Sequence, residues 1–116
     1  MSCLSKSFRL NNSKKINWLY KNAKKWHTPS FIVFYSHNTQ LQLAFITSKK
    51  VGNAVIRNKS RRRVRALVKD YEDNMIIGSY MFVMKNEINQ KSHIQLKKDF
   101  QFAFRRMKLF KNENNI

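Results

Sequence analysis

The sequence predicts a single α+β domain in which helices pack against one small mixed sheet. Three observations support this fold class. The chain has 116 residues, which is enough for one hydrophobic core and too few for two. Short β-prone apolar runs alternate along the chain with longer segments of helical periodicity. Only two glycines and one proline are present, so there is little material for a linker between domains.

The first expected element is a short helix near the N-terminus. A polar cap among residues 11–13 precedes Ile16, Leu19 and Tyr20, which follow at the i, i+3 and i+4 spacing of one helix face. Residues 1–8 and residues 111–116 are polar and lack periodicity. We therefore expect a flexible N-terminus over 1–8, one domain over 9–110 and a flexible C-terminal tail over 111–116.

Two β-prone runs follow the break at Thr28-Pro29. Residues 31–35 are five consecutive apolar residues, and residues 41–47 form a second run after a polar turn. We expect these two runs to pair as a hairpin. A further strand within residues 23–27 is an alternative that the sequence leaves open.

A long helix is expected from about residue 54 to residue 72, because Gly52 and Asn53 offer a turn and a cap and no helix breaker follows before Gly78. A strand is expected over residues 80–84, and Ser92 has the spacing of a capping box for a last helix. The strands on either side of the central helix would form a parallel crossover, but the sequence alone does not show this pairing.

The charge of the chain is the strongest indication of its partner. Lys and Arg number 24 against 6 Asp and Glu, which gives a formal net charge of +18. Such a chain repels itself unless a polyanion is near, so nucleic acid is the leading class of partner and an anionic membrane a distant one. No run approaches the ~20 apolar residues of a membrane-spanning helix. The lone Cys3 predicts no disulfide, and we expect a cytoplasmic protein.

The central helix is predicted to be amphipathic with a basic face. Arg57, Arg61 and Arg65 spread over only ~80° of the helix circumference, and Arg62 and Lys69 extend that face to ~140°. An apolar strip on the other side suits packing on a sheet. Like charges four residues apart repel, so a face kept only for solubility would mix signs. The planar guanidinium of Arg can bind a phosphate through two hydrogen bonds, and the pattern favours nucleic-acid binding.

Two residues interrupt the apolar strip of this helix. Ser60 falls near its centre, and we expect its hydroxyl to bond the carbonyl of Ile56. Arg63 lies at its margin, where its stem could cover apolar surface while its charged head reaches water.

The chain offers few groups for chemistry of its own. No phosphate-cradling glycine-rich loop or Gly-flanked serine is present, and the histidines lack recognisable acid or base partners. Asp70, Glu72 and Asp73 have no strong metal signature and are more typical of a surface patch. We expect no protein-held metal and no catalytic side chain. Exposed aromatic residues near the first helix and first strands would suit stacking on single-stranded nucleic acid.

Residues 48–65, SKKVGNAVIRNKSRRRVR, resemble the signature of the bacterial ribonuclease P protein subunit. That signature reads Lys, any residue, Gly, any residue, Ala-Val, any residue, Arg-Asn-Arg/Lys, any residue, Arg/Lys-Arg, two apolar residues and Arg. The frame from residue 9 to residue 110 fits as well, so the resemblance covers nearly the whole chain. The chain departs from the family pattern at Ile16, Ala23, Ser60 and Arg63.

The resemblance implies a left-handed β-α-β crossover around the Arg-rich helix. It also implies a protein that assists a catalytic RNA in removing the 5′ leader of precursor tRNA by Mg²⁺-dependent phosphodiester hydrolysis. The RNA would carry the catalysis and bind most of the Mg²⁺, with no organic cofactor, no DNA partner and no activity from the protein alone. By motif position, the residues that would face the catalytic RNA are Lys50, Asn53, Ala54, Arg57, Asn58, Lys59, Arg61, Arg62 and Arg65. A cleft between the first helix and the sheet would hold the leader, with Tyr20, Phe31 and Phe34 as the matching candidates.

An alternative function is that of a ribosomal or other structural RNA-binding protein, which would share the charge and size without a leader cleft. Binding that rises when a tRNA carries a 5′ single-stranded extension would distinguish the two. The sequence does not show which residue contacts which nucleotide, nor the oligomeric state.

Overall fold

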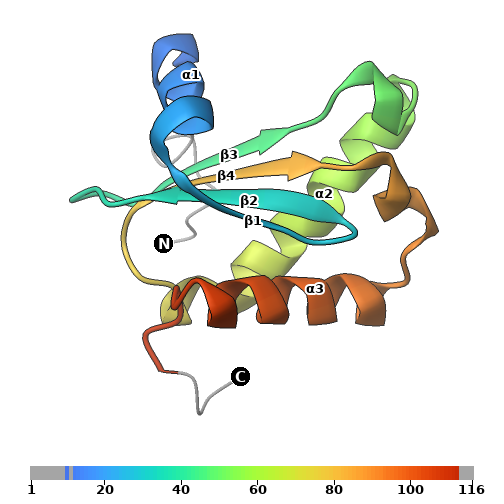
Figure 1. Cartoon of the computed structure of the whole chain (residues 1–116). Coiled ribbons are helices and arrows are strands. Elements are labelled where there is room, and N and C mark those ends of the chain that lie inside the picture. The colour runs from blue at the N-terminus through green and yellow to red at the C-terminus, as the bar shows by residue number, and fades with distance from the viewer. Residues whose placement is uncertain (1–9, 11, 113–116) are drawn as a thin grey trace.

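The computed structural model describes residue 10 and residues 12–112. Its helices and strands, in chain order, are α1 (Ser13–Asn22), β1 (Lys24–His27), β2 (Phe31–Ser36), β3 (Gln42–Ile46), α2 (Ala54–Tyr71), β4 (Ser79–Met84) and α3 (His93–Arg106). Short 3-10 turns η2 (Lys49–Val51), η3 (Glu72–Asn74) and η4 (Asn86–Gln90) lie between them. Helix α1 lies on one face of the sheet, and α2 and α3 cover the other face (Figure 1). The predicted α+β class is confirmed.

The four strands form one mixed sheet in the order β1-β2-β4-β3. Strand β4 pairs antiparallel with β2 and parallel with β3, so the predicted hairpin between residues 31–35 and 41–47 is wrong. The reason is the apolar character of β4, in which five of six residues are buried. Such a strand is most stable in the centre of a sheet, and it separates β2 from β3.

The antiparallel partner of β2 is instead β1, so the additional strand within residues 23–27 is present. Helix α2 connects β3 to β4, which confirms the parallel crossover around the Arg-rich helix. Its left-handed sense stays a prediction.

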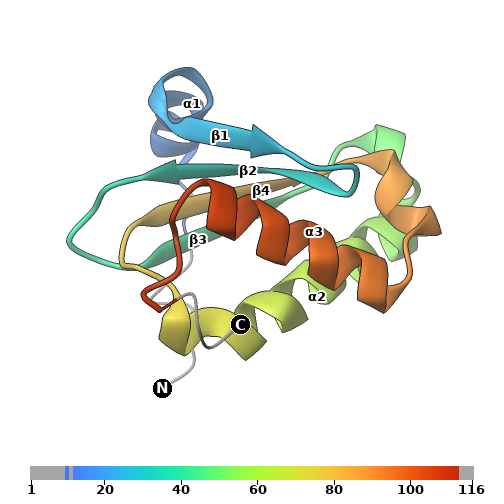
Figure 2. The ribbon, with the colours of Figure 1, turned by 60° about the horizontal axis from the view of Figure 1, so that its bottom comes forward.

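The main core lies between the sheet and the helices α2 and α3, which contact each other on this face (Figure 2). Its centre is a group of aromatic rings, in which Phe100 and Phe104 of α3 stack at 4.2 Å between centroids and lie against Phe82 of β4. Tyr71 of α2 stacks on Phe100 at 5.1 Å and joins the two helices. Each fully buried side chain of this kind contributes ~1.5–3 kcal/mol, so the larger cluster on this face supplies most of the hydrophobic stabilisation.

A smaller cluster forms on the opposite face, where Leu19 of α1 packs against Phe34, Ala44 and Met81. The Asn12 side chain accepts a hydrogen bond from the Lys14 N–H at 2.9 Å and caps α1 as expected. The last helix begins with the predicted capping box at Ser92. These two N-caps fix the residues at which α1 and α3 begin.

The C-terminal end of the domain extends past the predicted limit of residue 110. The Lys111 N–H donates to the Asn74 carbonyl at 2.7 Å, and the Asn112 N–H donates to Asn74 Oδ1 at 2.9 Å. Residues 1–8 and 113–116, expected to be flexible, lie outside the described residues.

Candidate nucleic-acid interface

The start of α2 is held by a glycine and a cap. Gly52 has φ of 149°, and a Cβ there would lie 2.8 Å from Ile56 Cγ2, so only glycine fits without strain. Asn53 Oδ1 accepts a hydrogen bond from the Ile56 N–H at 3.0 Å, which confirms the predicted N-cap. Lys50 lies just before this turn, in η2, and is exposed. The turn therefore sets the position of Lys50 relative to the basic helix.

The basic face of α2 is ordered by contacts within the helix and with residues of β3 and the segment after it. Arg61 donates to Thr47 Oγ1 at 2.7 Å and to Asn58 Oδ1, while the Arg65 guanidinium lies 5.2 Å from the centre of the Phe45 ring. Both side chains are half-buried, so their stems are held by the protein. Preorganised guanidinium groups lose less conformational entropy when they bind a phosphate.

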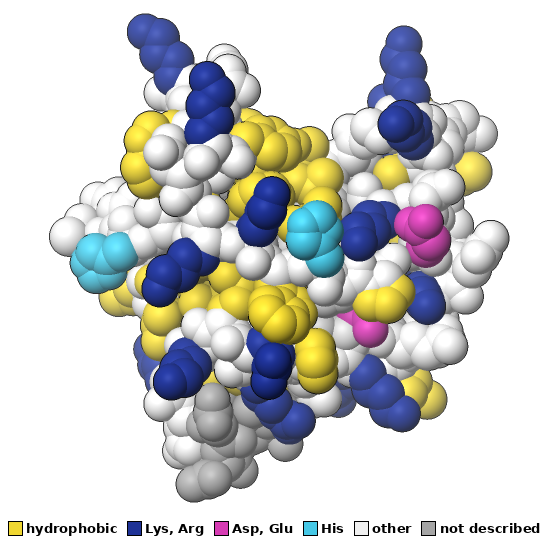
Figure 3. Space-filling view, viewed as in Figure 1, with side chains coloured by type: hydrophobic (Ala, Val, Ile, Leu, Met, Phe, Trp, Pro, Cys, Tyr) yellow, Lys and Arg dark blue, Asp and Glu magenta, His cyan; other side chains and the backbone are white. Residues whose placement is uncertain are grey.

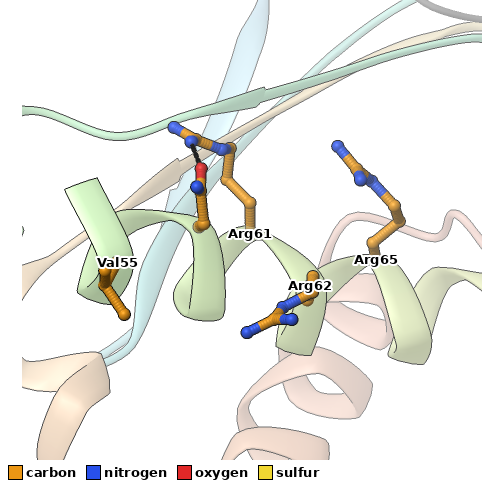
Figure 4. Close-up of a pocket in the computed structure, with 5 residues that line it drawn as sticks. Val55, Arg61, Arg62 and Arg65 are labelled. Atoms are coloured by element: carbon orange, nitrogen blue, oxygen red, sulfur yellow. Dashed lines mark hydrogen bonds between the residues drawn. The ribbon is translucent and has the colours of Figure 1, made fainter.

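A shallow hollow of about 430 Å³ lies on this face. It is lined by Val55, Asn58, Arg61, Arg62 and Arg65. Figure 4 shows Arg61 and Arg65 extending to the same side of α2 and Arg62 to the other, so the hollow has cations on both sides. No acidic residue lines it. Its charge and open shape suit the phosphate backbone of a nucleic acid.

The remaining motif residues lie along the same helix or at its start. Asn53, Ala54, Asn58, Lys59 and Arg62 are exposed, and Arg57 is half-buried. The structure brings Asn58, Arg61, Arg62 and Arg65 together around the hollow, whereas Lys59 lies on another side of α2 and lines a pocket with Ser60, Arg63 and Asn89. Which of them contact RNA stays a prediction.

Ser60 and Arg63 differ from their predicted contacts. The Ser60 hydroxyl donates to the Arg57 carbonyl at 2.8 Å rather than to that of Ile56, and the serine is buried. The Arg63 guanidinium does not end in water, because it donates to the carbonyls of Ile88 (2.8 Å) and Lys91. Arg63 thereby connects α2 to η4 and the residue after it, and it does not belong to the basic face.

The three aromatic residues predicted for a leader cleft do not lie together. Tyr20 is 43% exposed and meets Phe34 edge to face, with 5.3 Å between ring centroids. Burial of part of its ring raises the pKa of Tyr20 above its ordinary value. Phe31 lies on the other face of β2, fully buried against Phe82 and Phe100. Its assignment to the cleft needs correction, because residues three apart on a strand point to opposite faces.

The residues that continue the sheet face beside Tyr20 and Phe34 were not identified from the sequence. Ile32, Val83 and Ile46 are cross-strand neighbours on β2, β4 and β3, and all three are half-buried. Ile32 is two residues from Phe34, so the period of a strand could have identified it. Figure 3 shows apolar side chains on the floor of a hollow between α1 and the lobe that contains η2. We call this surface the α1 hollow.

The described residues do not form a metal site. Within residue 10 and residues 12–112, no group of three or more His, Cys, Asp and Glu side chains lies close enough to hold a metal ion. In the same part of the chain, no helix is long and apolar enough to cross a membrane.

A small α+β domain with one basic helix face and a separate apolar hollow is typical of a nucleic-acid-binding protein. The model of the Ribonuclease P family matches residues 4–108, and the chain belongs to this family, whose members are the protein subunit of ribonuclease P.

Relatives and solved structures agree with this assignment. The ribonuclease P protein component of Nitratiruptor sp. is 37% identical over 79 residues, which cover 68% of this chain and 72% of the relative. That of Syntrophomonas wolfei is 29% identical and covers 97% of this chain and 98% of its own length. The ribonuclease P protein of Staphylococcus aureus shares the fold with a TM-score of 0.82, at 22% identity and with 90% and 99% of the two chains covered. The Thermotoga maritima protein does so with a TM-score of 0.70, at 19% identity and with 79% and 90% covered.

Proposed function

We propose that the basic face of α2 binds the RNA subunit of ribonuclease P and that the α1 hollow binds the 5′ leader of precursor tRNA. The observation that carries the proposal is the uncompensated charge of α2, in which no acidic residue occurs from Ala54 to Lys69. A helix face of this kind gains its stability from a polyanion, since its cations repel one another. Membership of the ribonuclease P family supports an RNA of that ribonucleoprotein as the polyanion.

The α1 hollow supports binding of a single strand rather than a duplex. The ring of Tyr20 is half-exposed, and its edge-to-face contact with Phe34 restricts its orientation. Ile32, Ile46 and Val83 provide an apolar floor on which unpaired bases can stack or pack. Lys25 and His27 of β1 pair with Phe34 and Ile32, so they lie on the same face and can approach the phosphates of that strand.

The chemistry of leader removal would then belong to the RNA. The protein has no cluster of metal-binding side chains among the described residues, and we assign Mg²⁺ to sites formed by the RNA subunit. Two RNAs repel each other through their phosphates, and a chain of net charge +18 lowers that repulsion when it contacts both. The protein would therefore lower the Mg²⁺ concentration at which catalytic RNA and substrate associate. We place this function in the cytoplasm.

The test is cleavage of a 5′-extended precursor tRNA by a bacterial ribonuclease P RNA at low millimolar Mg²⁺, with and without the protein. We expect faster cleavage with the protein and none from the protein alone. Tyr20→Ala should reduce the stimulation for a substrate with a long leader more than for one with a single leader nucleotide. Equal rates with and without wild-type protein, together with retained RNA binding, would indicate a structural RNA-binding protein instead.

A further inference from the structure

A second pocket lies on the other side of α1 from the α1 hollow. Its volume is about 440 Å³. It is lined by Asn12, Lys14, Lys15, Trp18, Leu19, Ser36, His37, Asn38 and Ser79. None of these residues belongs to the basic face of α2 or to the α1 hollow, so the proposed function does not use this pocket.

The strand register shows that the pocket and the α1 hollow are separate. The middle row of the sheet, Ala44, Met81 and Phe34, is covered by Leu19 of α1. On one side of this row lie Ile32, Val83 and Ile46 of the α1 hollow, and on the other lie Ser36, Ser79 and Gln42. Ser36 and Ser79 line the pocket. Helix α1 therefore stands between two sites at opposite ends of the same sheet face.

Trp18 gives the pocket an aromatic wall. The indole is 50% exposed although its neighbour Leu19 is almost fully buried. A large apolar ring left half in water on a helix costs solvation free energy, and it is the preferred side chain for stacking on nucleobases.

The polar side of the pocket is ordered by hydrogen bonds. Gln42 Oε1 accepts from Lys15 Nζ at 2.7 Å, from Asn38 Nδ2 at 3.1 Å and from Ser79 Oγ at 3.1 Å. Asn38 Nδ2 also lies 3.1 Å from Ser79 Oγ. These bonds tie α1, the segment after β2 and the start of β4 together, so the pocket keeps its shape without a ligand.

The charge of the lining identifies the kind of ligand. Lys14 and Lys15 are cationic, His37 is exposed, and no acidic residue lines the pocket. Lys15 is held by Gln42, whereas Lys14 is exposed one helical turn from Trp18. An aromatic wall beside a cation and several amide and hydroxyl groups matches a nucleotide, with its base, its phosphate and its sugar hydroxyls.

We propose that this pocket binds one nucleotide of single-stranded RNA, with the base stacked on Trp18 and the phosphate near Lys14. The site extends the RNA contacts of the proposed function to the far side of α1. It rests on RNA binding by this protein and not on any contribution to catalysis.

The chain's two tryptophans allow a direct test. In a Trp26→Phe variant Trp18 is the remaining indole, and its fluorescence can be followed while a short single-stranded oligoribonucleotide is added. We expect saturable quenching, and a free mononucleotide should need a much higher concentration for the same effect because it lacks the flanking phosphates. Quenching by the mononucleotide at the same concentration would overturn the assignment to an RNA strand.

Substitutions separate stacking from other causes of quenching. Trp18→Ala should weaken binding of the oligoribonucleotide roughly tenfold, and Trp18→Phe should retain most of the affinity. Phe102→Ala is the matched control, because Phe102 is 55% exposed on α3 and lies on the other side of the sheet. Equal affinities for Trp18→Ala and wild type would overturn the proposal. Far-UV circular dichroism checks that each variant is folded.

Failure of the nucleotide pocket can be distinguished from failure of the proposed function. A protein that stimulates cleavage by the RNA subunit but shows no quenching of Trp18 would contradict the pocket alone. Quenching without any stimulation of cleavage would contradict the role in ribonuclease P and leave the pocket as a nucleotide site.

Discussion

Arg62 and Arg63 are adjacent in the sequence and have different roles in the structure. Arg62 is exposed and lines the hollow on the basic face of α2. Arg63, one residue or about 100° further around the helix, points away from that face and donates to two backbone carbonyls beside η4. One arginine is therefore available to a phosphate, and the other is used by the fold.

We expect Arg63→Ala to lower the free energy of unfolding by ~1–3 kcal/mol. The substitution removes two charge-assisted hydrogen bonds and leaves the Ile88 and Lys91 carbonyls with fewer donors. Arg62→Ala is the control and should change stability by no more than ~0.5 kcal/mol, because the side chain is exposed. Urea unfolding of the two variants measures the difference. Equal stabilities would contradict the structural role of Arg63.

At the scale of elements, the helices could be predicted from the sequence and the strand pairing could not. The caps at Asn12, Asn53 and Ser92 act on residues two or three positions away, so a local pattern reveals them. Pairing of β2 with β4 joins residues about 50 positions apart. The predicted hairpin between residues 31–35 and 41–47 was wrong because a local pattern does not reveal such a distant partner.

The difference between local and distant contacts also decides which parts of the candidate site could be predicted from the sequence. The basic face of α2 follows from helical periodicity, which is local. The α1 hollow is formed by three strands and a helix, and its floor is defined by the sheet order. Phe31 was assigned to it by resemblance, whereas the period of two along β2 places Phe31 on the opposite face from Phe34.

The turn before α2 gives a prediction at this scale. Gly52→Ala should destabilise the protein by ~1–3 kcal/mol, because φ of 149° strains any L residue and the new Cβ would approach Ile56 Cγ2 to 2.8 Å. In an Ile56→Ala background the clashes with Cγ2 and Cδ1 should disappear, whereas the close approach to Cβ at 2.9 Å and the backbone strain should remain, so Gly52→Ala should cost less but still destabilise. Thermal unfolding of the four proteins in this cycle measures the part of the cost that comes from the Ile56 side chain beyond Cβ. A fully additive cycle would contradict the contact with Ile56.

For the whole molecule, the buried aromatic core makes stability depend on pH in alkaline solution. Burial, and to a lesser extent nearby Tyr35, raises the pKa of Tyr80 well above its ordinary value of 10.0. The folded chain therefore holds this proton where the unfolded chain loses it, so stability is complete below about pH 10 and falls as the pH rises further.

The expected slope from Tyr80 is at most ~1.4 kcal/mol per pH unit. Unfolding free energies measured on both sides of pH ~10 test this, with Tyr80→Phe as the comparison. The variant loses the hydrogen bond from Tyr80 Oη to the Ile76 carbonyl, and its stability should decline less steeply with pH. Identical slopes would show that the Tyr80 hydroxyl is not kept neutral by the fold.

The basic face of α2 and the α1 hollow lie next to each other in the molecule. The α1 hollow faces the lobe that contains η2, and α2 begins directly after η2 (Figures 1 and 3). The aromatic core on the other side of the sheet holds α2 in this position. A protein of this shape can contact a folded RNA through α2 while a single strand lies in the hollow.

The most direct test of this account is the salt dependence of binding to a bacterial ribonuclease P RNA, measured for wild type, Arg62→Ala and Arg105→Ala. Both arginines are exposed on helices, but Arg105 belongs to α3 and lies away from the basic face. Arg62→Ala should reduce the slope of log affinity against log salt by roughly 0.7–0.9 for the lost phosphate contact, and Arg105→Ala should leave it unchanged. Equal slopes for wild type and Arg62→Ala, or the same reduction in both variants, would contradict binding of the RNA subunit by the basic face of α2.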